Sequence, residues 1–317
     1  MKARTPKILL AITAALFVTV AKAQDTNYVA SYGHRMSAKA FFFSDNFEMS
    51  SSDAGLNYIP QSHSGVGIGI WTKYFPFDIS YRHEVAFSGG LKYRKTGATD
   101  MQLKGYSRFF VGDIYIQHYT GFLETEEDEI YKVSEMTDSE KYQPDLSAFY
   151  FAAIGNYVFN HEQFSYNAGF NGSERQKISA GTPLAGLAIY NQRISSDSTM
   201  FLGEKADLKS WSLGINGGYA YNFVIKSKFL IFLAGNVGIN ASGCNFGKIF
   251  SKEAKIAPAI HAKFAFWYNM KHWSIGLTGT GNNLKESFGS NIGITQNSSK
   301  TELIFVRRFC YKQSHNS

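Results

Sequence analysis

The sequence predicts an all-β fold: a single antiparallel transmembrane β-barrel of about 12 strands, behind a cleaved signal peptide. Hydrophobic residues alternate with small or polar ones, with period two, in segments of ten residues or more. Aromatic residues gather beside short turns, as they do at the interfaces of membrane barrels. The composition, 44% hydrophobic and 16% aromatic, is too aromatic for a disordered chain. Beyond the N-terminus no apolar run reaches the roughly 18 residues of a spanning helix, which excludes helical membrane bundles.

Residues 1–23 have the pattern of a Sec signal peptide. A basic start and an apolar stretch, residues 8–20, precede a small-residue cleavage site at Ala21-Lys22-Ala23. An uncleaved anchor helix needs a longer apolar run. We therefore predict cleavage after Ala23, a barrel over residues 24–309 and a short periplasmic tail over residues 310–317. Loss of the four signal-peptide cations lowers the formal net charge from +7 to +3, so nucleic acid is not an expected partner.

Alternation is clearest in the segment from Trp211 to Phe223. One strand face there is apolar and ends in aromatic residues, and the other holds only small or polar residues. The same pattern recurs at 77–84, 164–171, 260–268 and 273–278. A soluble β-sandwich also alternates, but its strands are shorter, roughly five or six residues, and lack aromatic residues at the ends of their apolar faces. The pattern therefore favours the membrane barrel.

Turn lengths predict the topology, because outer-membrane barrels have short periplasmic turns and long outer loops. Short turns are expected near residues 75–76, 107–108, 160–163, 225–228 and 269–271. Long polar connections are expected near residues 50–62, 87–98, 121–145, 172–208, 242–254 and 283–297. This alternation gives 12 strands with both chain ends in the periplasm.

One apolar segment, Pro183 to Tyr190, does not fit that count, because a further strand would make the number odd. We assign it to the fourth outer loop, residues 172–208, as a hairpin arm or an infolded plug. A barrel of 14 strands is the alternative, if that loop returns through the membrane.

Several motifs resemble a known family. They are Pro144-Asp145-Leu146, the run from Asn156 to His161, Phe164-Ser165-Tyr166, and the run from Glu174 to Gly181, which is the most specific. Together they are similar to the domain of unknown function family 4421, exported proteins mostly from Bacteroidota that are grouped with outer-membrane β-barrels. The resemblance spans the mature chain. It implies the fold and the location, but no activity, because the family has none assigned.

The C-terminal segment from Glu302 to Phe309 is predicted to be the last strand, ending in the aromatic residue that barrel-assembly machinery recognises in outer-membrane proteins. Cys310 follows it at the periplasmic end, whereas Cys244 lies in an outer loop. A wall of about 25 Å separates these ends, and a disulfide tolerates only about 7 Å between Cα atoms. We therefore predict no intramolecular disulfide.

Neither catalysis nor metal binding is expected. Five histidines lie in the predicted barrel with two serines and an asparagine nearby, but no G-x-S-x-G motif frames a serine. These residues are His83, His118, His161, His261, His272, Ser165, Ser274 and Asn167. The acidic stretch at 124–145 lacks the spacing and the turn glycine of a calcium loop. We expect a protein that is not an enzyme and has no cofactor.

The candidate site is a polar network at the rim and in the lumen. Its expected centre is an outer-rim run, in which the two cations would meet an anionic ligand or form salt bridges at the base of a loop. Its members are Glu174, Arg175, Gln176 and Lys177, with the lumen residues Asp78, Arg82, Arg108, Asp113 and Lys263 placed by alternation.

Three classes of function follow. The leading hypothesis is passive passage or binding of small polar or anionic solutes by an outer-membrane barrel. The second is a non-enzymatic membrane anchor or assembly barrel, and the third a lipid-active barrel enzyme. The expected partners are outer-membrane lipid, the barrel-assembly machinery during insertion and a small polar solute. The sequence leaves the oligomeric state open.

Overall fold

A computed structural model describes residues 24–32, 36–51, 55–60, 63–72, 75–84, 97–126, 142–201, 204–288 and 292–309. The strands are β1 (Val29–Ser31), β2 (Met36–Ser51), β3 (Leu56–Ile59), β4 (His63–Thr72), β5 (Phe75–Glu84), β6 (Gly97–Tyr106), β7 (Phe110–Glu126), β8 (Tyr142–Val158), β9 (Glu174–Gln176), β10 (Ala180–Phe201), β11 (Glu204–Ile225), β12 (Phe229–Gly243), β13 (Lys255–Asn269), β14 (Trp273–Phe288) and β15 (Ile292–Phe309). Two short helices are η3 (Asn167–Asn171) and η4 (Phe246–Phe250). Among these residues no helix is long and apolar enough to cross a membrane.

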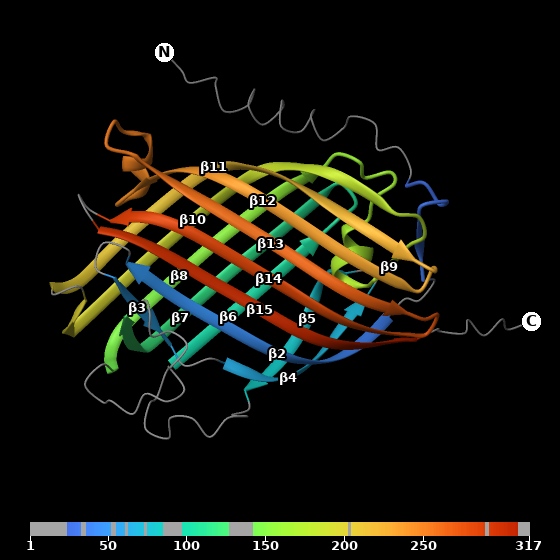
Figure 1. Ribbon diagram of the computed structural model, residues 1–317, viewed down its shortest axis with the longest axis horizontal. Coiled ribbons are helices and arrows are strands. Elements are labelled where there is room, and N and C mark those ends of the chain that lie inside the picture. Colours follow the sequence, from blue (N-terminus) through green and yellow to red (C-terminus); the bar gives the residue numbers. More distant parts are fainter. Residues whose placement is uncertain are drawn as a thin grey trace, which may run out of the picture.

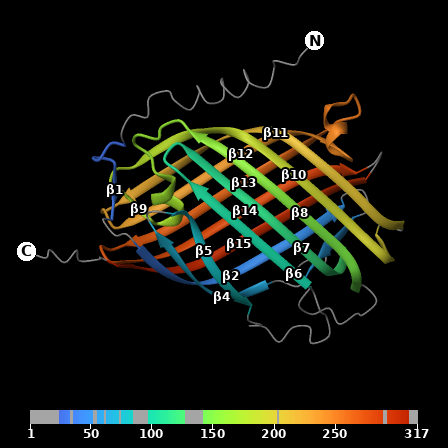
Figure 2. The same cartoon turned by 180° about the vertical axis from the view of Figure 1, so that it is seen from behind.

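The strands form a closed antiparallel barrel (Figures 1 and 2). From β15 the wall runs through β14, β13, β12, β11, β10, β8 and β7, and β15 also pairs with β2. The sheet closes between β7 and β2 in two ways. The shorter circuit, of ten strands, passes through β3, and the longer one, of twelve, passes through β6, β5 and β4. The predicted all-β barrel of about 12 strands is therefore confirmed.

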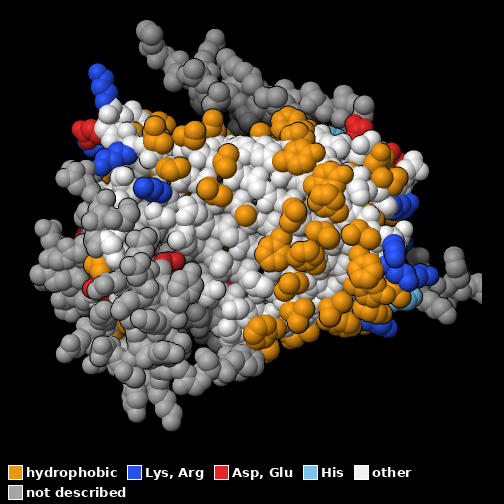
Figure 3. All heavy atoms as spheres, viewed as in Figure 1, with side chains coloured by type: hydrophobic (Ala, Val, Ile, Leu, Met, Phe, Trp, Pro, Cys, Tyr) orange, Lys and Arg blue, Asp and Glu red, His pale blue; other side chains and the backbone are white. Residues whose placement is uncertain are grey.

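Along the wall strands, the residues predicted to face the lumen are buried and those predicted to face outward are more exposed. On β13, His261 and Lys263 are buried in the lumen, whereas Ile260, on the other face of the strand, is exposed. On β11, Ser212 is fully buried and Ile215, on the other face, is 68% exposed. Figure 3 shows apolar side chains spread over the outer surface. Apolar residues outside and polar residues inside give the surface that a barrel needs in lipid.

Aromatic residues lie at the end of the barrel where the turns are short, as their position beside short turns in the sequence predicts. Tyr157 packs edge-on against Phe159, and Tyr221 lies beside Phe223, with ring centroids 5.1 and 4.3 Å apart. Phe229 on β12 lies opposite Tyr268 on β13, with ring centroids 4.9 Å apart. Trp267, next to Tyr268 on β13, points into the lumen and is buried.

The sequence placed one strand wrongly. Residues 164–171 alternate like a strand, yet they form a one-turn π-helix and its approach inside the barrel. The wall strand is β10, which contains the apolar segment Pro183 to Tyr190 and pairs with both β8 and β11. That segment is therefore neither a loop hairpin nor a plug. The two errors cancel in the strand count, and the alternative of 14 strands is wrong.

Two connections also differ from the prediction. The turn expected at residues 160–163 opens a longer connection, residues 159–179, between β8 and β10. The long loop expected at residues 283–297 is instead strand, because β14 reaches Phe288 and β15 begins at Ile292. The signal peptide, the C-terminal tail with Cys310, and most of the acidic connection after β7 lie outside the described residues.

Candidate functional site: the filled lumen

The connection between β8 and β10 folds into the lumen at the short-turn end, and we call residues 159–179 the plug. The side chains of Phe164, Tyr166, Ala168 and Phe170 are all buried. They pack with inward side chains of the wall, including Phe232 of β12, whose ring centroid lies 5.0 Å from that of Tyr166. The plug is therefore part of the hydrophobic core of the protein and not a surface loop.

Hydrogen bonds attach the plug to several wall strands. Trp267 Nε1 donates to the Gly169 carbonyl at 2.9 Å, and Asn222 Nδ2 donates to the Ser165 carbonyl at 2.9 Å. The Arg308 guanidinium donates to the Gly172 carbonyl at 2.7 Å and to Ser274 Oγ at 2.8 Å. Three of these bonds join backbone carbonyls of the plug to side chains of β11, β13 and β15.

Two glycines allow the plug to fit so closely. Gly172 ends the π-helix with a left-handed φ of 63°, and its Cα faces the ring of Trp267. A Cβ at Gly169 would lie 2.3 Å from Phe232 Cδ2 and 2.4 Å from Asn222 Oδ1. A larger side chain at Gly169 would displace the plug from the wall, and one at Gly172 would be strained by the left-handed φ.

The run Glu174-Arg175-Gln176-Lys177 lies at this same end, so its predicted place at the outer rim is wrong. Its first three residues form β9, which pairs with β1 near the N-terminus of the described chain. Arg175 donates to the Ser227 carbonyl in the β11–β12 turn, and Lys177 donates to the Thr26 carbonyl. The run therefore fastens the plug to the N-terminal segment and to a turn.

Glu174 has an unusual environment within this run. Ser165 Oγ donates a hydrogen bond to its Oε2 at 2.6 Å. Burial raises the pKa of the Glu174 carboxyl, while the Ser165 hydrogen bond and the Arg108 charge act against that rise. Arg108, a predicted network member, thus lies near this run and not with the other predicted lumen residues.

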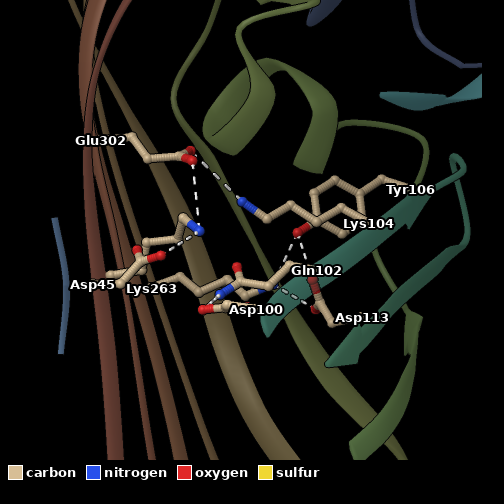
Figure 4. A network of polar contacts seen from close by, with 9 residues as sticks. Asp45, Asp100, Gln102, Lys104, Tyr106, Asp113, Lys263 and Glu302 are labelled. Carbon is tan, nitrogen blue, oxygen red and sulfur yellow. Dashed lines mark hydrogen bonds and ion pairs between the residues drawn. The ribbon is translucent and has the colours of Figure 1, made fainter. Parts of the chain in front are cut away.

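A buried ion pair crosses the middle of the lumen (Figure 4). Lys263 Nζ on β13 lies 2.5 Å from Asp113 Oδ2 on β7 and 2.9 Å from the Tyr106 hydroxyl. Tyr106 in turn donates to Asp113 Oδ1 at 2.8 Å. The sequence predicted that Asp113 and Lys263 both face the lumen, and the structure brings them together.

A second group of charges continues the polar layer toward β15 and β2. Lys300 Nζ lies 3.2 Å from Asp45 Oδ2 and 4.0 Å from Glu302 Oε1. Lys104 of β6 lies 3.8 Å from Glu302 Oε2. Sequence reasoning did not single out these four residues, although their alternation on β2, β6 and β15 was a usable signal.

Next to this charged layer, toward the long-loop end of the lumen, lie a tyrosine, a histidine and a buried carboxylate. The Tyr190 hydroxyl lies 2.6 Å from His261 Nε2, and His261 Nδ1 lies 2.9 Å from Asn282 Oδ1. Glu286 is fully buried and accepts a hydrogen bond from Ser212 Oγ at 2.5 Å. Apolar residues of β2, β3, β7, β8, β10, β14 and β15 then fill the long-loop end.

The space beside the central ion pair is small. A cavity of about 10 Å³ is lined by Asp113, Asn156, Asn236, His261 and Lys263, among others. That volume is near the lower limit for a single water molecule. Asn156 Oδ1 and Asn236 Oδ1 have no hydrogen-bond partner, so one water molecule donating to both would satisfy them.

The remaining predicted residues do not join this network in the described part of the chain. Asp78 and Arg82 lie on β5, and their side chains are outside the described residues. His118 is exposed on the outer face and lies 2.9 Å from Ser147 Oγ, and His161 contacts the ring of Phe109. No group of three metal-ligating residues occurs among the described residues.

A family model described as Domain of unknown function (DUF4421) matches residues 23–309. The chain belongs to this family. The match spans nearly the whole chain and confirms the resemblance found in the sequence. No curated protein matches the chain.

Several solved structures of outer-membrane proteins match this chain, all with low sequence identity and low TM-scores. The outer-membrane protease OmpT of Escherichia coli is 7% identical, with a TM-score of 0.34, and the match covers 87% of this chain and 97% of that one. A bacterial polysaccharide outer-membrane secretin is 7% identical, with a TM-score of 0.35 and coverage of 88% and 99%. The P. putida toluene transporter TodX is 7% identical, with a TM-score of 0.24 and coverage of 88% and 91%.

Proposed function

We propose that this protein is an outer-membrane β-barrel that works with a closed lumen, as a membrane-anchored scaffold, and not as an open pore or an enzyme. The filled lumen carries this proposal. The plug occupies the short-turn end, ion pairs cross the middle, and the enclosed cavity beside Asp113 and Lys263 measures only about 10 Å³. A barrel of this size is narrow enough for side chains to block it.

Two further features support the proposal. The plug is held by buried aromatic contacts and by donors from several wall strands, which is typical of permanent core packing. The apolar outer surface, with aromatic residues at the short-turn end, favours lasting contact with outer-membrane lipid. Passage of small polar or anionic solutes requires displacement of the plug and stays a prediction.

Planar-bilayer conductance tests the closed state. We expect no stable conductance from the mature chain once its folding is confirmed by the heat-sensitive migration of unboiled protein on a gel. Replacing Phe164, Tyr166 and Phe170 together by Ser should loosen the short-turn end and produce only brief, unstable current, because the ion pairs and the apolar residues of the long-loop end remain. Phe159→Ser is the matched control, because its side chain is 56% exposed, and it should stay silent. Stable conductance of the unmodified chain would contradict the proposal.

A further inference from the structure

The barrel wall has one weakly paired boundary, between β5 and β6. Among the described residues these strands share a single pair, Phe77 with Gly105, whereas all other neighbours in the twelve-strand circuit share at least seven. We call this boundary the seam; it comprises residues 79–84 of β5 and 97–104 of β6. Above the seam β3 joins β2 to β7 and closes the wall at the long-loop end.

A seam of this kind is unfavourable in a membrane. Backbone N–H and C=O groups that lack a strand partner are costly in hydrocarbon, which is why spanning sheets close completely. The edges of β5 and β6 therefore favour an occupant that brings its own polar groups to the level of the seam.

The inner faces of β6 and the neighbouring β7 supply acceptor atoms that receive no hydrogen bond. Gln102 Nε2 and Gln117 Nε2 both donate to the same oxygen, Asp100 Oδ2, at 3.3 and 3.1 Å. This arrangement leaves Asp100 Oδ1, Gln102 Oε1 and Gln117 Oε1 buried without a partner. Three unpaired acceptors side by side are stabilised by a molecule that offers several donors.

The surrounding charges indicate what kind of molecule fits. Among the described side chains beside β6, Asp45, Asp100 and Glu302 outnumber Lys104 and Lys300 by one negative charge, which disfavours a phosphate group. Two of the three unpaired acceptors are neutral amide oxygens, which suit hydroxyl donors. On the outer face of the same strand Met101 and Leu103 are 49% and 42% exposed, and they offer an apolar surface to acyl chains.

We propose that the seam is a lateral binding site for an amphiphile with an uncharged, hydroxyl-rich head, such as a glycosyl lipid. The head enters between β5 and β6 and donates hydrogen bonds to Asp100, Gln102 and Gln117, while the acyl chains stay in the membrane beside Met101 and Leu103. Binding requires local separation of the two strands, which the single pair at Phe77 and Gly105 allows.

Native mass spectrometry of the folded, mature barrel tests this site, with dodecyl maltoside as the probe and dodecylphosphocholine as the competitor of equal chain length. We expect retention of the maltoside and not of the phosphocholine. Asp100→Leu with Gln102→Leu should weaken maltoside retention about tenfold or more, since two hydrogen bonds are lost. Asp207→Leu, an exposed carboxylate on β11, is the control and should change nothing.

A disulfide across the seam provides an independent test. Phe77 and Gly105 are the one pair that holds the two strands together, so both are replaced by Cys in a chain whose Cys244 and Cys310 are Ser. Oxidation should abolish maltoside retention and reduction should restore it. Retention that is unchanged by the disulfide or by loss of the acceptors would overturn the proposal, as would equal retention of the phosphocholine. The conductance experiment has a separate readout, so the two proposals can fail independently.

Discussion

Lys263 on β13 and Asp113 on β7 meet across the lumen, with Nζ 2.5 Å from Oδ2 and both side chains less than a tenth exposed. The strands that carry them are far apart in the sequence and do not pair with each other. The contact therefore depends on the closed barrel, and it ties opposite parts of the wall together where the lumen is most polar.

The ion pair predicts that mutations of Lys263 and Asp113 have non-additive effects on the free energy of unfolding. Lys263→Met leaves the Asp113 carboxylate buried without its cation, so the free energy of unfolding should fall by about 3–5 kcal/mol. Lys263→Met combined with Asp113→Leu removes both charges and should recover much of that loss. Urea unfolding in lipid vesicles, followed by tryptophan fluorescence, measures both. A double variant as unstable as the sum of the single changes would contradict the buried pair.

The plug predicts a steric effect at Gly169. A methyl group there meets Phe232 and Asn222 within 2.4 Å, so Gly169→Ala should displace the plug and lower stability by about 1–3 kcal/mol. Gly235→Ala is the matched control, because a Cβ there has no neighbour within 4 Å. Trypsin cleavage near Arg175 and Lys177 should become faster in the first variant only. Equal resistance of both variants would show that the plug is not packed in this way.

Glu174 predicts a pH dependence at the short-turn end. The pKa of its carboxyl is raised in the folded state, mainly by burial, so the folded state binds more protons than the unfolded state above the ordinary glutamate pKa of about 4.5. Stability should therefore be highest below that value and decrease as the pH rises through the raised folded pKa. In Glu174→Gln this component should vanish. Hydrogen exchange of residues 159–179 between pH 4 and pH 8 measures it, and an increase in protection with pH would contradict the assignment.

The outer surface predicts a position-dependent cost of charge. Ile215 lies in the middle of β11 and is 68% exposed, so Ile215→Arg should cost about 2–4 kcal/mol in a bilayer. Phe223 lies on the same face near the short turn, and Phe223→Arg should cost only about 0–1 kcal/mol beyond the loss of its ring contact with Tyr221. Reversible unfolding in vesicles measures both costs. Equal effects would place the membrane elsewhere.

Strand faces were predictable because each wall strand separates lipid from a polar or small-residue lumen. Ile215 and Ser212 on β11, and Ile260 and Lys263 on β13, lie on the faces that alternation predicts. The predictions that Asp113 and Lys263 face inward needed nothing more than this local pattern. Their contact was beyond the sequence, because it depends on the curvature and closure of the whole wall.

The plug could not be distinguished from a strand for a related reason. Phe164, Tyr166, Ala168 and Phe170 alternate with polar residues, but the segment is enclosed by the barrel, so tertiary contacts and not periodicity decide its structure. Interpreting this segment as a wall strand makes β10 an apparent loop. The same interpretation places the Glu174 to Lys177 run at the wrong end of the barrel.

The reactivity of a single lumen cysteine tests the closed barrel most directly. Ala234 faces the lumen on β12 beside Lys263 and is 8% exposed, whereas Cys244 beyond the end of the same strand is exposed and free. A charged thiosulfonate reagent is added to the folded chain carrying Cys244 alone, and to one carrying Ala234→Cys alone, with Cys310 replaced by Ser in both. The closed lumen predicts rapid modification of Cys244 and very slow modification at position 234 until the protein is unfolded. Equal rates in the folded barrel would contradict a filled lumen.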